Sequence, residues 1–242
     1  MGGAPTSAPA LTGASGANDV ECRVVLASLC GVGVLIAVEG IDGAGKRTLV
    51  DGLTSRWRDA GRRVTTMAFP RYGESVHADI AAEALHGAHG DLRSSAYAMA
   101  MLFALDRAGA TADIRAALAG SDVVLLDRYV ASNAAYTAAR CGEDATGEAV
   151  GWVAELEFHR FALPVPDHHL LIDVPAEVAM GRAAARGDAD TSRGRDLYER
   201  DNDLQRDVDA VYRQLAQTNW LSPWWVLDAN LAPSLADDLL TA

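Results

Sequence analysis

Among the residues that could do chemistry, one lysine stands out. The chain of 242 residues has 21 lysines and arginines together, and Lys46 is the only lysine. It closes the segment Gly40-Ile-Asp-Gly-Ala-Gly-Lys46, which has the G-x-x-x-x-G-K spacing of a phosphate-binding loop. Such glycines let the backbone N–H groups point inward at a phosphate, and the lysine reaches the β and γ phosphates. We therefore predict an ATP-binding loop made by Gly40, Gly43, Ala44, Gly45, Lys46, Arg47 and Thr48.

The position after Lys46 departs from the usual pattern. A serine or threonine that binds Mg²⁺ normally stands there, but this chain has Arg47, and Thr48 comes one place later. A shift of one residue turns a helical side chain by about 100°, so Thr48 is a poor substitute. We expect carboxylates, water and phosphate oxygens to hold the metal, and Arg47 is a candidate phosphate contact.

Two strand-like runs end in arginine. Asp127-Arg128-Tyr129 follows the buried run 123–126, and Phe69-Pro70-Arg71 stands where the run 64–69 ends. Arg128 would bind a transferring phosphoryl group if it lies beside the phosphate loop. The alternative for the first run is an aspartate that caps the next helix, with a solvated arginine beside it.

A third aromatic and arginine pair lies within a helical pattern. Phe103 and Arg107 are one helical turn apart, so they share a face. The ring could stack on a base while the guanidinium binds a phosphate or a base edge. The alternatives are a phenylalanine in the core and an arginine on the surface.

A cluster of arginines follows later in the chain. Arg182, Arg186, Arg193 and Arg195 lie in or beside a stretch rich in Gly, Asp and Ser, and Glu199 comes shortly after them. One interpretation is a solvated loop. We favour a mobile lid over about 187–196, whose arginines close over ATP and stabilise the charge that develops during transfer.

The elements that must position these residues follow an alternating pattern. We predict strands over 34–39, 64–69, 123–126, 169–174 and 224–227, and helices over about 50–60, 95–119, 204–215 and 231–241. Strands separated by helices imply an α/β fold with a parallel sheet that is covered on both faces. Functional residues should then gather at the carboxyl ends of the strands.

Composition narrows the class of protein. Half of the residues are hydrophobic and 22% are charged, which is typical of a globular protein. A net charge of −12 argues against a general nucleic-acid binder. Three scattered cysteines are too few for a disulfide framework, as expected in a reducing cytosol.

The first 33 residues differ from the rest. Residues 1–17 carry no charge and show no helical or strand period, so we predict a disordered extension. The uncharged run 24–38 is shorter than the roughly 20 residues that a membrane helix needs. Valine at position 34 is what a GTG start codon would encode within a longer reading frame. We therefore expect residues 1–33 to be dispensable and the cell to make the protein from position 34.

Taken together, these segments resemble the thymidylate kinase family, and its actinobacterial members in particular. The resemblance covers 34 to about 227 and rests on 39–48, 69–72, 102–107, 126–136 and 198–200. It implies a fold like that of the P-loop nucleoside monophosphate kinases, with a five-stranded parallel sheet flanked by helices. It also implies a cytoplasmic homodimer that uses ATP and Mg²⁺ to convert dTMP to dTDP for dTTP synthesis.

The same resemblance implies roles for individual residues. Phe103 would stack on thymine, Arg107 and Asn133 would read its polar edge, and Arg71 and Arg128 would bind the dTMP phosphate. Asp42 and Tyr136 would lie near the sugar, where Tyr136 helps to exclude a ribose 2′-hydroxyl. Phe69 and Tyr198 complete the substrate set, Asp42 and Glu199 would lie near Mg²⁺, and Lys46, Arg128 and Asp42 would be the catalytic residues.

Other functions stay open at this stage. A deoxynucleoside kinase would need a carboxylate base near the second strand, which here ends in Phe-Pro-Arg. Another nucleoside monophosphate kinase would share most of the pattern. A regulatory nucleotide-binding protein would leave Phe69, Arg71, Phe103 and Arg107 without a role. A GTPase that reads guanine with Asn-Lys-x-Asp is excluded, because the single lysine belongs to the phosphate loop.

Overall fold

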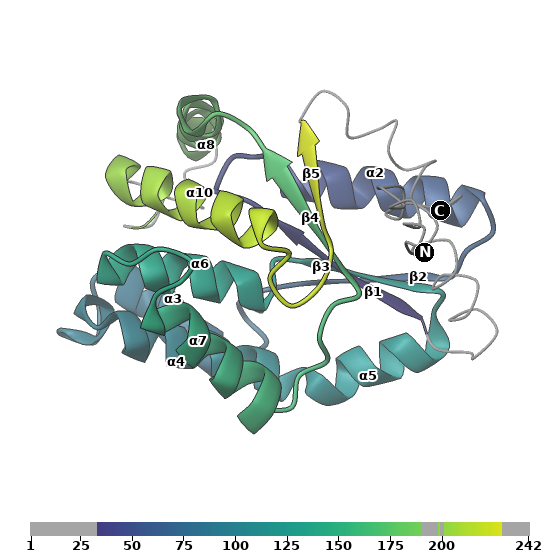
Figure 1. Cartoon of the computed structure of the whole chain (residues 1–242), viewed down its shortest axis with the longest axis horizontal. Coiled ribbons are helices and arrows are strands. Elements are labelled where there is room, and N and C mark those ends of the chain that lie inside the picture. Colours follow the sequence, from purple (N-terminus) through teal and green to yellow (C-terminus); the bar gives the residue numbers. More distant parts are fainter. Residues whose placement is uncertain (1–32, 190–197, 199–200, 229–242) are drawn as a thin grey trace, which may run out of the picture.

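The computed structural model describes residues 33–189, 198 and 201–228. Five parallel strands form one sheet, as the alternating pattern predicted, and their order is β2-β3-β1-β4-β5 (Figure 1). They are β1 Val34–Glu39, β2 Val64–Ala68, β3 Val123–Asp127, β4 His168–Asp173 and β5 Trp224–Asp228. All six residues of β1 are buried, because this central strand is covered on both faces.

The register of the sheet brings three chain segments to one edge. Val38 of β1 is paired with Asp127 of β3, and Asp127 is paired with Ala68 of β2. The next residues along the chain are Glu39, the last residue of β1, and Arg128 and Phe69, which follow β3 and β2, so all three lie at the same carboxyl edge. This edge is where open parallel sheets bind their ligands.

Helices cover both faces of the sheet. Helix α2, which follows β1, lies on one face, and α5 lies on the other (Figure 1). The change of face follows from right-handed crossovers, because the chain moves one way along the sheet from β1 to β2 and the opposite way from β2 to β3. The helices of the described residues are α2 Lys46–Asp59, α3 Val76–Leu85, α4 Ala96–Gly109, α5 Thr111–Gly120, α6 Val130–Cys141, α7 Glu148–Ala154, α8 Ala176–Ala189 and α10 Asn202–Gln217. A 3₁₀ turn, η1 Leu92–Ser94, precedes α4, and a π-helical turn, η2 Glu155–Arg160, directly follows α7.

The single helix predicted over 95–119 is wrong, since the chain forms α4 and α5 with a break at Ala110. The N–H of Ala110 bonds to the carbonyl of Arg107, three residues back, and the hydroxyl of Thr111 bonds to the carbonyl of Ala108. Gly109 ends α4, and a Cβ there would lie 3.1 Å from Nη2 of Arg71. Because Gly109 has no Cβ, the Arg71 side chain has room to lie against the end of α4.

The core has two parts. The main cluster surrounds the sheet, and a smaller one lies between α3 and α4 and consists of Ala81, Ala84, Leu85 and Met99. Phe103 and Tyr198 pack against this smaller cluster. Within the described part of the chain, no helix is long and apolar enough to span a membrane. The helix predicted over 231–241 and most of the expected lid and extension lie outside the described residues.

Candidate active site

The phosphate loop has the backbone that its glycines predict. Gly40, Gly43 and Gly45 have φ angles of 141°, 87° and 105°, which other residues rarely adopt. Gly43 is also in close contact with α8, because a Cβ there would lie 1.9 Å from the carbonyl oxygen of Ala179. The loop thus folds tightly at the carboxyl end of β1 and leads directly into α2.

Lys46 is held by the loop that precedes it. Its Nζ donates hydrogen bonds of 2.9 Å to the carbonyl oxygens of Gly40 and Ile41, and the residue is buried. Burial and the nearby charge of Arg128 lower the pKa of Lys46 to about 8, against the opposing effect of Asp42. The ammonium group is therefore preorganised and poorly solvated, which strengthens its interaction with any anion.

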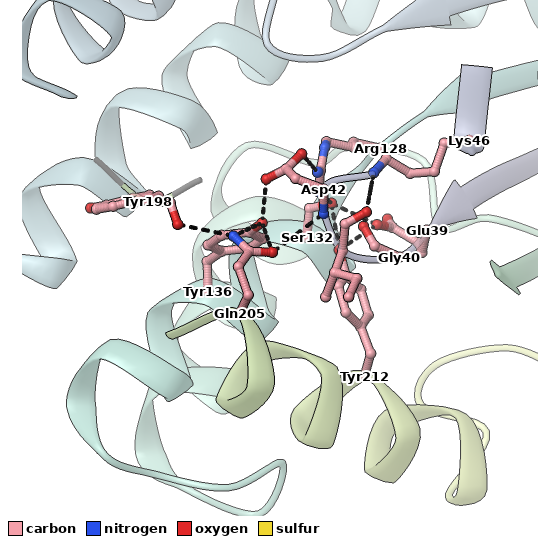
Figure 2. Close-up of polar contacts among 11 residues, drawn as sticks. Glu39, Gly40, Asp42, Lys46, Arg128, Ser132, Tyr136, Tyr198, Gln205 and Tyr212 are labelled. Carbon is pink, nitrogen blue, oxygen red and sulfur yellow. Dashed lines mark hydrogen bonds and ion pairs between the residues drawn. The ribbon is translucent and has the colours of Figure 1, made fainter. Parts of the chain in front are cut away.

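Asp42 lies at the centre of a polar network (Figure 2). Its Oδ1 pairs with Nη2 of Arg128, and its Oδ2 accepts a hydrogen bond of 2.8 Å from the hydroxyl of Tyr136. Gln205 of α10 donates to the same hydroxyl at 3.2 Å and also accepts from the backbone N–H of Asp42 at 3.3 Å. The network joins the phosphate loop to α6 and α10.

The same network keeps Asp42 ionised. Burial alone would raise the pKa of its carboxyl, but the charges of Arg128 and Lys46 and the hydrogen bond from Tyr136 outweigh burial and bring the pKa to about 2. A carboxylate of this kind can bind Mg²⁺, which prefers one or two carboxylates together with phosphate oxygens and water. No group of three or more possible metal ligands occurs among the described residues, so Asp42 fits Mg²⁺ only in that mixed arrangement.

Glu39, the last residue of β1, is linked to this network through Ser132. It is fully buried, and its carboxylate accepts hydrogen bonds from the backbone N–H of Tyr129 at 2.9 Å and from the hydroxyls of Ser132 at 2.6 Å and Tyr212 at 2.9 Å. Burial raises the pKa of Glu39 although these hydrogen bonds and the charge of Arg128 act against it. Since Nη1 of Arg128 donates to Ser132 at 3.3 Å, Glu39 fixes the position of Arg128 indirectly.

A cavity of about 200 Å³ opens beside this network. Its walls come from the loop, from the segment after β2 and from α3, α4 and α6, with Tyr198 on one side. Tyr136 and Tyr198 stack with their ring centroids 6.1 Å apart. The lining includes these predicted site residues: Asp42, Phe69, Phe103, Arg107, Arg128, Asn133, Tyr136 and Tyr198. Eight predicted residues, which come from several segments of the chain, therefore line one cavity.

Other predicted residues lie elsewhere. Arg71 is bound to Asp106 through its backbone N–H and its Nε, both at 2.9 Å, and does not line the cavity. Arg47 and Thr48 are exposed on α2, where Arg47 lies 3.8 Å from Asp51. Arg182 is exposed on α8. The side chain of Arg186 and the residues Arg193 and Glu199 lie outside what the structure describes.

The sequence model of the thymidylate kinase family matches residues 38–234, a range that contains every predicted site residue. The chain belongs to the thymidylate kinase family. It is 58% identical over 200 residues to the thymidylate kinase of Mycobacterium tuberculosis H37Rv, which covers 83% of this chain and 94% of that protein. It is also 35% identical over 214 residues to the thymidylate kinase of Thermomicrobium roseum, covering 86% of this chain and 92% of that protein.

Family membership confirms the resemblance seen in the sequence, including its actinobacterial character. The sequence did not predict four polar residues of the site. They are Glu39, Ser132, Glu157 and Gln205, each at most 8% exposed. Gln205 lies next to the apolar pattern of α10, and Glu157 follows Val150 and Val153 at helical spacing. A polar side chain within an apolar helical stripe is the signal that could have identified these two residues.

Proposed function

We propose that this chain transfers the γ-phosphoryl group of ATP to dTMP, giving dTDP and ADP. One observation carries the proposal: a phosphate loop with Lys46 lies beside a cavity lined by an aromatic ring, Phe103, and by polar side chains suited to a pyrimidine nucleotide. Family membership points to the same reaction.

The ATP side of the reaction belongs to the loop. The N–H groups of the loop and the positive end of α2 would hold the phosphates, and Lys46 would neutralise charge as the γ-phosphoryl group leaves. Gly40, Gly43, Ala44, Gly45, Arg47 and Thr48 complete this set, and the lid arginines Arg182, Arg186 and Arg193 would close over it. Bound Mg²⁺, held by Asp42 and Glu199, would neutralise the phosphate oxygens further.

The acceptor side belongs to the cavity. Arg128 lies in its wall and is held by Asp42 and Ser132, so it would bind the dTMP phosphate next to the loop. Arg71 would join it after exchanging part of its contact with Asp106. A phosphate acceptor is already ionised at neutral pH, so the reaction needs positioning and charge neutralisation rather than a strong base.

The sugar and the base complete the acceptor site. Tyr136, whose hydroxyl is fixed by Asp42 and Gln205, would lie against the sugar and disfavour a ribose 2′-hydroxyl. Phe103 would stack on thymine between Phe69 and Tyr198, and Arg107 and Asn133 would read its edge. We propose a cytoplasmic homodimer on the family resemblance alone, and sedimentation velocity tests the dimer.

A deoxynucleoside kinase is the second candidate, and it needs a free carboxylate at the end of β2. The carboxylate that contacts the segment after β2 is that of Asp106 on α4, and it is fully buried and engaged by Arg71. This engagement favours a monophosphate as the acceptor.

The proposal is tested with purified protein, ATP and Mg²⁺ against a panel of dTMP, dUMP, dCMP, dGMP and AMP, with products separated by chromatography. We expect dTDP as the main product and no turnover after chelation of Mg²⁺. Preferential turnover of a purine nucleotide would overturn the assignment.

A further inference from the structure

The carboxylate of Glu157 links two side chains of the cavity. Its oxygens accept hydrogen bonds from Nε and Nη2 of Arg107 at 2.5 and 2.7 Å, and Oε1 also accepts from Nδ2 of Asn133 at 2.8 Å. Glu157 is fully buried and lies within the π-helical turn η2. Turns of this kind are rare and occur often at functional sites.

We propose that Glu157 is the positioning residue that sets which pyrimidine base the cavity accepts. This inference rests on the proposed function, and it assigns a specificity role to a residue that lies behind the cavity wall. Glu157 would act through the direction in which Asn133 and Arg107 present their donors and acceptors to the base.

Glu157 fixes the orientation of the Asn133 amide. The nitrogen of this amide donates to Oε1 of Glu157 and also to the carbonyl oxygen of Ala100, at 3.0 Å. A reversed amide would place its own oxygen against two acceptors, and this residue is 4% exposed, so water could not relieve the conflict. The amide oxygen is therefore the polar atom that Asn133 can offer to the cavity.

Glu157 also restricts Arg107. Two of the three guanidinium nitrogens donate to the carboxylate, which leaves Nη1 for a ligand. The side chain of Arg107 is only 3% exposed, and the carboxylate balances its charge. The cavity wall thus offers one acceptor and one donor without an uncompensated charge beside a neutral base.

This pair of groups matches one pyrimidine edge and opposes another. Thymine and uracil have a donor at N3 and an acceptor at O4, which complement the Asn133 oxygen and the Arg107 nitrogen. Cytosine has an acceptor at N3 and a donor at N4, so both contacts become mismatched. A site that leaves buried polar groups unpaired rejects the wrong ligand strongly. We therefore expect dCMP to be disfavoured by at least about 10²-fold.

The test is Glu157→Gln, with Glu155→Gln as its control. A glutamine of the same size has an NH₂ group that opposes a donor of Arg107 or Asn133 and allows the Asn133 amide to reverse. We expect kcat/KM for dTMP to fall about tenfold or more, mostly through KM, while the KM for ATP stays unchanged. The preference for dTMP over dCMP should fall by a similar factor. Glu155 lies on the same turn with its side chain 58% exposed, so its variant should match the wild type.

The outcomes separate this inference from the proposed function. A wild type that phosphorylates no pyrimidine monophosphate would overturn both. A wild type that prefers dTMP, together with a Glu157→Gln variant that keeps the same dTMP to dCMP ratio, would overturn the inference alone. If the variant does not fold, calorimetry on the wild type decides: dUMP should bind nearly as tightly as dTMP, and dCMP binding as tightly as dUMP would contradict the assigned polarity.

Discussion

Lys46 lies in the phosphate loop and has a lowered pKa, so we expect activity to depend on pH. Burial and the charge of Arg128 bring the pKa to about 8, so the ammonium form dominates below that pH and is lost above it. Because kcat/KM reports the free enzyme, kcat/KM for ATP should fall about tenfold for each pH unit well above the pKa. A profile that stays flat to pH 10 would contradict this assignment.

Two variants serve as controls for the pH profile. Lys46→Ala should lower kcat by about 10²–10³, as expected when a preorganised cation is removed from a developing charge, and the basic limb should disappear with the lysine. Arg56→Ala removes a cation from the exposed face of the same helix and should retain both the activity and the profile.

Phe103 borders both the cavity and the core. Replacing it with alanine should therefore show whether the ring contributes mainly to dTMP binding or to stability. It lines the cavity and also packs against the small cluster between α3 and α4. If the ring stacks on the base, Phe103→Ala should cost about 1–3 kcal/mol in dTMP affinity. If the ring only fills the core, the loss should appear as about 3–5 kcal/mol of stability.

The matched control for Phe103 is Leu102→Ala. Leu102 packs against the same small cluster but does not line the cavity. Its variant should lower Tm and leave dTMP affinity unchanged. Calorimetric titration and thermal melting on both variants decide between the two roles, and equal dTMP affinity in both variants would argue against stacking.

Among the helices, the contact between the phosphate loop and α8 predicts that alanine at Gly43 and alanine at Gly52 have opposite effects on stability. Gly43→Ala adds a methyl group 1.9 Å from the carbonyl of Ala179 at a φ of 87°, so α8 must move. We expect it to lose at least about 1–3 kcal/mol of stability and to raise the KM for ATP.

We expect Gly52→Ala to have the opposite effect on stability. Gly52 lies in the middle of α2, and nothing lies within 4 Å of its added Cβ. Since alanine favours a helix over glycine, this variant should gain about 0.5–1 kcal/mol. Denaturant unfolding of both variants checks the pair, and a Gly43→Ala protein as stable as the wild type would show that the loop and α8 are not in close contact.

The sequence predicted all five strands because buried parallel strands form continuous apolar runs between clear breaks. It did not predict α3 or α6. Nine of the twelve residues of α6 are buried, and they include the polar residues Ser132, Asn133 and Thr137, so the buried face is not a plain apolar stripe. The sequence predicted the cavity residues that follow strands, such as Arg128. It missed Glu157 and Gln205, because their partners Arg107 and Tyr136 lie 50 and 69 residues away and only the folded chain brings them together.

At the scale of the whole molecule, the described fold predicts that residues 1–32 are dispensable. The described site residues that we assign lie between Glu39 and Gln205, and β1 begins at Val34, directly after Gly33, whose N–H bonds to the carbonyl of Leu118 at 2.7 Å. A protein that lacks 1–32 should therefore keep the kcat, the KM values and the Tm of the full chain. A lower Tm or aggregation of the shortened protein would contradict this expectation and give the segment a structural role.

The proposed acceptor already carries a phosphate, and a competition between dTMP and thymidine tests this assignment. The full-length protein is given ATP, Mg²⁺ and equal concentrations of dTMP and thymidine, and the products are separated by chromatography over time. Because Arg128 lines the cavity and the carboxylate of Asp106, on α4, is engaged by Arg71, we predict that dTDP forms while thymidine stays unchanged. Phosphorylation of thymidine in preference to dTMP would show that the acceptor is a nucleoside and not a monophosphate.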